Sequence, residues 1–176
     1  LVESLRAVKD EDEIGHIKRA IELSDAAFDY ISQTIKAGMT EREVAWELEG
    51  FMRENGSESL PFEIIVASGP NSALPHAQPS ERPISQGEPT VIDMGARVEG
   101  YSSDLSRTIC LGPRDRSFEK IYDLVLGAQL TAIATIEAGM SGEMADKLAR
   151  TVIEKGGYGE RFGHGLGHGV GLAPHE

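Results

Sequence analysis

Two aspartates, Asp93 and Asp104, lie in neighbouring segments with the residue pattern of β-strands. Residues 90–95 and 103–111 are the expected strands of a hairpin. A turn centred on Val98-Glu99 would set Asp93 directly opposite Asp104, with Cβ atoms about 4.5–5.5 Å apart. Two like charges at that spacing repel, so we expect a pair of divalent cations to offset the repulsion. The alternative is that one aspartate lies in the turn or at a bulge and faces solvent.

A glycine-rich segment, residues 163–171, carries two histidines, His164 and His168, among five glycines. Glycine is a poor helix former but lets the backbone come close to a ligand, so a strand or loop that borders a site is expected. His175 follows shortly after this segment, and His76 lies in a turn-rich loop of the first half. Imidazole and carboxylate groups together form the ligand set of hydrolytic metal sites.

Each histidine alone also has a structural explanation. His76 could be a turn residue beside Pro75, and His175 could be a polar residue near a chain end. His16, on the first predicted helix, is expected to be a solvated surface residue.

Other catalytic patterns are missing from the sequence. It contains no Gly-x-Ser-x-Gly nucleophile turn, phosphate loop, dinucleotide fingerprint or His-Glu-x-x-His pair. The one cysteine, Cys110, falls among apolar strand residues and is predicted to be a core residue rather than a nucleophile. These other catalytic templates therefore fit the sequence poorly.

The elements that must position these residues follow a repeat. Apolar periodicity and Gly38 predict a first helix, and the Thr40/Glu43 capping box opens a second, which ends at Asn55-Gly56. A strand is expected over residues 62–67. The helix pattern returns after Phe118, with residues 35–40 matching residues 136–141 at an offset of 101. We interpret this as an internal duplication; the alternative is coincidental turn chemistry.

The duplication predicts an α+β fold of two pseudo-symmetric helix-helix-strand halves with a cleft between them. It also places the counterpart of the hairpin at about residues 191–212, beyond Glu176. We therefore expect the second half to be incomplete. Because the sequence opens on Leu1 rather than methionine, the chain is interpreted as a piece of a longer protein.

Composition narrows the class of partner. The 176 residues carry a net charge of −12, which argues against nucleic acid or an anionic membrane as partner. No apolar run approaches the ~20 residues needed to cross a bilayer. A single cysteine excludes an internal disulfide, which favours a reducing compartment and a cytoplasmic location.

Two motifs resemble a known family. Residues 91–96 (VIDMGA) and 100–108 (GYSSDLSRT) resemble the metal-binding hairpin of the Xaa-Pro aminopeptidases and prolidases. Residues 167–172 (GHGVGL) with His175-Glu176 resemble the second motif of that family. These enzymes belong to the pita-bread metallopeptidases, as do methionine aminopeptidases and creatinase.

The resemblance implies a role for each matching residue. Asp93 would chelate one metal ion, Asp104 would bridge two, and His168 would bind the second. His76 and His175 would act in catalysis by contacting the substrate and stabilising the developing negative charge, and His164 would line the substrate pocket. Ser106 would hydrogen-bond to a metal ligand. Two further glutamates of the family, one of which relays the proton, would lie in the missing strands.

The resemblance further implies that residues 1–176 are a partial catalytic metallopeptidase domain of pita-bread fold. Its reaction would be hydrolysis before proline by a hydroxide shared between two divalent ions, with Mn²⁺ favoured and Co²⁺, Zn²⁺ or Fe²⁺ possible. The substrate would be a peptide or dipeptide with proline in second position, and the full-length protein would be a homodimer. The alternatives are a methionine aminopeptidase, a creatinase-like hydrolase or a non-catalytic module that binds peptides or proteins. The 176-residue chain alone is expected to be inactive.

Overall fold

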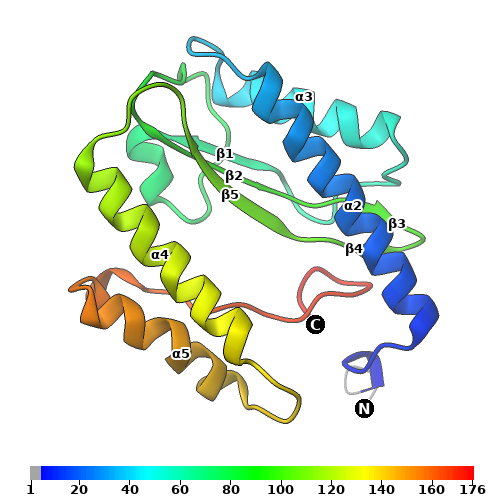
Figure 1. Cartoon of the computed structure of the whole chain (residues 1–176). Helices are drawn as coiled ribbons and strands as arrows, with labels where there is room; N and C mark the ends of the chain where they lie inside the picture. Colours follow the sequence, from blue (N-terminus) through cyan, green and yellow to red (C-terminus); the bar gives the residue numbers. More distant parts are fainter. Residues whose placement is uncertain (1–4) are drawn as a thin grey trace. The chain divides into compact units, whose positions relative to one another are not determined.

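The computed structural model describes residues 5–176 and divides them into two compact units. The first unit comprises the chain up to Pro113 together with Gly169–Glu176, and the second is Arg114–His168. Figure 1 traces both units along the chain. Each is described here by itself.

Two helices begin the first unit, as the sequence predicts. Helix α2 (Glu11–Thr34) and helix α3 (Glu41–Glu54) each open on a capping box, formed by Asp10 with Glu13 and by Thr40 with Glu43. In both boxes the side chain of the cap residue accepts a hydrogen bond from the amide of the third helical residue. The glutamate at that third position accepts one from the amide of the cap residue, so two amides at the helix start gain a partner. The box at Asp10 was not anticipated from the sequence.

The strands form a three-stranded antiparallel sheet and a short two-stranded ribbon. The sheet has the order β1 (Ile65–Ser68), β2 (Pro89–Met94), β5 (Leu105–Cys110), and the ribbon pairs β3 (Arg97–Val98) with β4 (Tyr101–Ser102). The first strand begins at Ile65 rather than at residue 62. The ladder between β1 and β2 ends at the pair Ile65–Asp93, so residues 62–64 lie outside β1.

The helices and the sheet share one apolar core. Alternate residues of β2 are buried, and they pack in a cluster with side chains of α2, α3 and β1, namely Ile31, Val44, Leu48, Met52, Val66, Ile92 and Met94. Side chains alternate between the faces of a strand, so Asp93, between Ile92 and Met94, points to the opposite face. The fold thus places the first candidate ligand away from the helices.

The second unit repeats the helix pair. Helix α4 (Arg116–Thr135) and helix α5 (Gly142–Lys155) pack around Ala128, Ala132, Ala149 and Ile153, and a short 3₁₀ helix, η2 (Gly159–Arg161), follows. The amide of Met140 donates to Glu137 as that of Met39 does to Lys36, an offset of 101. Gly139 and Gly38 both have positive φ, at 92° and 97°. The repeat predicted from the sequence is therefore confirmed in the backbone.

Two single-residue predictions were wrong. The ring of His16 is not simply solvated: it stacks on Tyr101 with 5.3 Å between centroids, and the Tyr101 hydroxyl donates to Glu13 at 2.8 Å. Cys110 lies at the end of β5 and is half-buried rather than a core residue. No helix within residues 5–176 combines the length and apolar character needed to span a membrane.

Candidate metal and substrate site

The hairpin that carries the two aspartates has a different register from the one predicted. Its turn is centred on Glu99 and Gly100, whose φ values of 51° and 80° are those of a type I′ turn. Asp93 pairs with Ser106, so the prediction that it lies directly opposite Asp104 was wrong. The error is two residues. Asp104 lies just before β5, and continuing the register past the pair Met94–Leu105 would set it diagonal to Asp93 on the same face.

Diagonal placement suits two carboxylates better than direct opposition. Diagonal neighbours in an antiparallel pair are about 7–8 Å apart, which weakens their repulsion while both stay on the same face. Ser106 takes the directly opposite position, and its hydroxyl donates a 2.6 Å hydrogen bond to Oδ1 of Asp93. The predicted hydrogen bond from Ser106 to a candidate ligand, Asp93, is therefore found. It orients the Asp93 carboxylate.

A glycine beside the aspartates makes room for close packing. A Cβ atom added to Gly95 would lie 2.2 Å from the carbonyl oxygen of Ser103, 2.7 Å from Pro61 Cγ and 2.9 Å from Phe62 Cε1. The approach of the two backbones at this point therefore requires glycine. Pro61 and Phe62, which sequence reasoning did not single out, pack where the hairpin bends.

The segment that carries His175 is attached to the same hairpin. The amide of Ser102 donates to the carbonyl of Gly171 at 2.7 Å. Within the segment itself, the amide of Glu176 donates to the carbonyl of Gly169 at 3.0 Å. Lys9 lies 3.0 Å from the Glu176 carboxylate, and Arg6 also pairs with it. Burial raises the pKa of Glu176, but bonds from Ala173, Lys9 and Arg6 outweigh it and lower that pKa to about 2. An ionised Glu176 thus anchors the segment beside His175.

The segment that carries His164 is anchored within the second unit. Arg150 donates to the carbonyl oxygens of Phe162 and His164, each at 2.8 Å, and forms a two-point ion pair with Asp146. Asp146 also accepts the amide of Leu166 at 2.9 Å. The hydrogen bond from Arg150 is the largest cause that lowers the pKa of Asp146. Residues 162–176 form neither helix nor strand, so of the strand or loop that the glycine content predicted, a loop is found.

The predicted metal ligands and substrate-contacting histidines are divided between the two units. Asp93, Asp104, His76 and His175 belong to the first unit, and His164 and His168 belong to the second. Within residues 5–176, no three histidine, cysteine, aspartate or glutamate side chains gather closely enough to hold a metal ion. Two carboxylates on one face, one of them oriented by Ser106, do match the oxygen donors that hard divalent cations prefer. The first unit therefore fits part of the predicted metal site.

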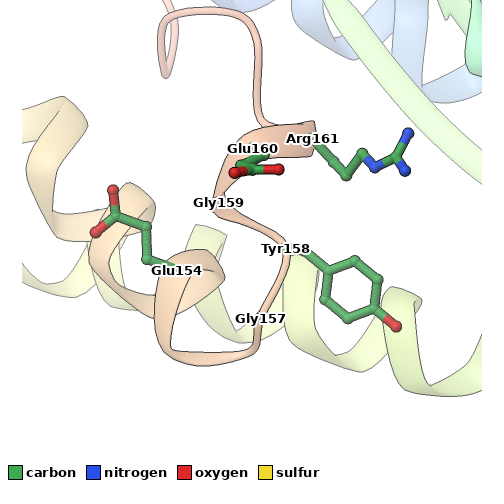
Figure 2. Close-up of a pocket in the computed structure, with 6 residues that line it drawn as sticks. All are labelled: Glu154, Gly157, Tyr158, Gly159, Glu160 and Arg161. Carbon is green, nitrogen blue, oxygen red and sulfur yellow. The ribbon is translucent and has the colours of Figure 1, made fainter.

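A hollow in the second unit contains none of the predicted residues. It is lined by Glu154, Gly157, Tyr158, Gly159, Glu160 and Arg161. Figure 2 shows Tyr158 and Arg161 extending away from the Glu154 carboxylate rather than converging on a common point. This hollow offers no set of converging groups.

Comparisons with known proteins give a consistent result. The family model described as metallopeptidase family M24 matches residues 15–176. An Xaa-Pro dipeptidase of Pyrococcus horikoshii is 42% identical over 176 residues, which cover 100% of this chain and 50% of that protein. The structure of an X-Pro aminopeptidase from Thermotoga maritima aligns with a TM-score of 0.96 and 46% identity over 99% of this chain and 50% of that one. An Xaa-Pro dipeptidase from Bacillus anthracis aligns with a TM-score of 0.98 and 48% identity, covering 99% and 49% of the two chains.

These matches confirm the predicted fold class and show how much of its relatives the chain corresponds to. The α+β architecture is the pita-bread fold, as the hairpin and histidine motifs indicated. The chain spans about half the length of the relatives it matches.

Proposed function

Because the chain belongs to metallopeptidase family M24, we propose that the whole protein hydrolyses the peptide bond between an N-terminal residue and proline. The observation that carries this proposal is the similarity, over the full length of this chain, to proteins named Xaa-Pro dipeptidase and X-Pro aminopeptidase. Substrates of this class are dipeptides or longer peptides with proline in second position.

In this proposal, the two catalytic metal ions are held by Asp93, Asp104 and His168. The first two lie on one face of the hairpin, and the hydroxyl of Ser106 keeps the Asp93 carboxylate oriented. Two divalent cations, when bound, supply the Lewis acidity that makes water a nucleophile near neutral pH. Oxygen-rich ligation with one imidazole favours Mn²⁺ and also suits Co²⁺, Zn²⁺ or Fe²⁺.

The histidines of the loops act on the substrate. His76 and His175 contact the peptide and donate to the scissile carbonyl oxygen as negative charge develops there, an effect worth roughly 3–4 kcal/mol per donor. His175 is suited to this role because its segment is fixed to the hairpin through Ser102 and Gly171. His164 lines the pocket that takes the peptide. No residue of this chain is assigned the proton transfer to the leaving imide nitrogen.

The ligand assignment is tested with Asp104→Ala in the whole protein. The expected result is loss of bound metal, measured by elemental analysis, and a drop in Xaa-Pro turnover on the order of a thousandfold or more. Glu99→Gln is the matched control, because it removes a negative charge from the same hairpin at an exposed turn position. Retained metal and turnover in Asp104→Ala would contradict the assignment.

The substrate class is tested separately with a panel. Xaa-Pro dipeptides, longer Xaa-Pro peptides, peptides that begin with methionine, and creatine distinguish the members of the fold. Turnover confined to the Xaa-Pro compounds, lost with a chelator and restored with Mn²⁺, is the expected outcome. Preference for a methionine peptide or creatine, or turnover of none of the panel, would overturn the proposal.

A further inference from the structure

A buried carboxylate in the first unit lies outside the predicted site. Glu41 is the first residue of α3, and its side chain is 0% exposed. Its Oε1 accepts from the amide and hydroxyl of Ser68 at 2.7 and 2.8 Å, and its Oε2 accepts from the amide and hydroxyl of Ser80 at 3.1 and 2.6 Å. Asn71 Nδ2 lies 3.1 Å from each oxygen. The number of hydrogen-bond donors around this one buried side chain indicates that the carboxylate has a specific role.

The two serines mark the two ends of one loop. Ser68 is the last residue of β1, and Ser80 follows residues 69–79, which we term the His76 loop. One carboxylate therefore closes the loop at its base. The amides of Glu41 and Arg42 add bonds of 3.1 Å to the carbonyls of Arg82 and Ser80, so the start of α3 holds the far end of the loop through its backbone as well.

The charge of Glu41 matters for this arrangement. Burial raises its pKa, but the hydrogen bonds from Ser80 and Ser68 outweigh burial, and the net pKa is below the ordinary value. Arg82 donates to Ser68 Oγ at 2.6 Å and pairs with Glu88, so it extends the network. Of the groups that bond to Oε2, Asn71 Nδ2 and the Ser80 amide can only donate hydrogen bonds. A carboxamide NH₂ in the place of Oε2 would also be a donor, so it could not accept these two bonds.

The same anchor reaches the strand that carries a predicted ligand. Ser68 pairs with Thr90 of β2, and three residues further along this ladder Ile65 pairs with Asp93. A loop fixed at Ser68 is therefore fixed relative to the strand of Asp93. A loop tied only by its ends to flexible chain would not keep a histidine in register with that strand.

Resting on the proposed function, in which His76 contacts the substrate, we propose that Glu41 is a positioning residue for His76. Its carboxylate ties Ser68 to Ser80, and so sets the geometry of the His76 loop against the strand of Asp93. Glu41 itself does not touch the reacting atoms. A merely structural role for Glu41 is the competing explanation, and it predicts loss of stability without a specific effect on His76.

The experiment compares Glu41→Gln with Glu43→Gln in the whole protein. Both remove one charge from the first turn of α3, but among residues 5–176 Glu43 hydrogen-bonds only within its capping box. Glu41→Gln is expected to speed amide hydrogen exchange in residues 69–79, which include the short 3₁₀ helix η1 (Gly69–Ala73), about tenfold and to lower kcat about tenfold or more, with bound metal unchanged. Glu43→Gln is expected to change both by less than about twofold. Unchanged exchange in the loop of Glu41→Gln would overturn the proposal.

A double-mutant cycle separates positioning from general stability. In a His76→Ala background, Glu41→Gln is expected to lower kcat by less than about twofold further, because the histidine it positions is gone. The full loss in both backgrounds would show that Glu41 does not act through His76, and would overturn the proposal. If Glu41→Gln fails to fold, Ser80→Ala removes one donor and keeps the charge. It should change loop exchange and kcat in the same direction by about threefold, and no change in either would overturn the proposal.

Failure of the proposed function gives a different result. Wild-type protein without Xaa-Pro turnover would contradict the proposed function. The anchoring of the loop by Glu41 would still be measured by the amide hydrogen exchange of residues 69–79. Wild-type turnover with equal kcat in Glu41→Gln would leave the proposed function in place and contradict positioning alone.

Discussion

The helix pair α2–α3 and the helix pair α4–α5 share backbone hydrogen bonds at an offset of 101 residues but bury different surfaces. Ala20 and Ser24 of α2 are almost fully buried in the first unit. Their counterparts on α4, Ile121 and Val125, are 42% and 51% exposed, although both are larger and apolar. The turn that follows the first helix of each pair is local and is repeated, whereas burial depends on what packs against each helix.

Helix α4 carries a broad exposed apolar surface. Its members are large side chains that would be core residues in most helices, namely Ile121, Tyr122, Val125, Leu126, Leu130 and Ile133. In the first unit, α2 packs against strands β3, β4 and β5. Contiguous exposed apolar surface of this kind marks a contact site. We expect strands equivalent to those to cover α4 in the whole protein.

The largest expected effect comes from exchanging the core residues of the two pairs. Leu48 is fully buried in α3, and its counterpart in α5 is Ala149. Leu48→Ala is expected to cost about 3 kcal/mol through the cavity it leaves, and Ala149→Leu about 1–3 kcal/mol through overpacking. Urea unfolding of this chain measures both. If either exchange were neutral, the two pairs would share side-chain packing as well as backbone.

The second effect concerns glycines that have opposite roles in the two units. Gly95→Ala would push a Cβ against the Ser103 carbonyl, and we expect a loss of about 2–3 kcal/mol. Gly127 of α4 has nothing within 4 Å of the same position, so Gly127→Ala should gain about 0.5–1 kcal/mol from helix propensity. Unfolding midpoints compare the two. A tolerated Gly95→Ala would show that the hairpin bend can relax.

The elements of the fold were predictable because their signals are local. Thr40 with Glu43, and the glycines after each helix, fixed the helix boundaries from sequence alone. The hairpin register was missed because the turn residue Glu99 adopts positive φ, which is unusual for a residue other than glycine. A shift of two residues leaves the faces unchanged, so the aspartates were placed on one face despite the wrong partner.

The site was less predictable because its supports come from distant parts of the chain. Glu41 was not singled out from the sequence, because a glutamate in the first turn of a helix is common and favours the helix dipole. Only the folded structure shows that Ser68 and Ser80 converge on it. The pairing of Lys9 with Glu176 likewise joins the two ends of the chain, and no sequence periodicity could indicate it.

A third effect tests whether strands cover α4 in the whole protein. Val125→Ser, which introduces the residue found at the counterpart position Ser24, should change the stability of this chain by less than about 0.5 kcal/mol. In the whole protein the same substitution should cost about 1–2 kcal/mol, since burial of valine would be lost. Lys120→Ser on the same helix is the control in both proteins. Equal effects in the two proteins would contradict a covered α4.

The smallest effect concerns a cap that differs between the two helix pairs. Thr40 and Glu43 form a reciprocal box. At the start of α5, Ser141 accepts a hydrogen bond from the amide of Met144, but the Met144 side chain has no carboxylate to accept one from the Ser141 amide. Met144→Glu supplies a carboxylate that can accept the Ser141 amide, and we expect a gain of about 0.5 kcal/mol. Met144→Leu, which keeps an apolar side chain, is the control.

The dependence of that gain on pH identifies its cause. In the existing box, the Thr40 amide lowers the pKa of Glu43, so the bond stabilises the fold above the ordinary glutamate pKa of ~4.3 and is lost as pH falls through the lowered value. The gain from Met144→Glu should follow the same course when urea midpoints are measured between neutral pH and about pH 3. If the gain persists in acid, it comes from helix propensity, and the difference between the two caps is not electrostatic.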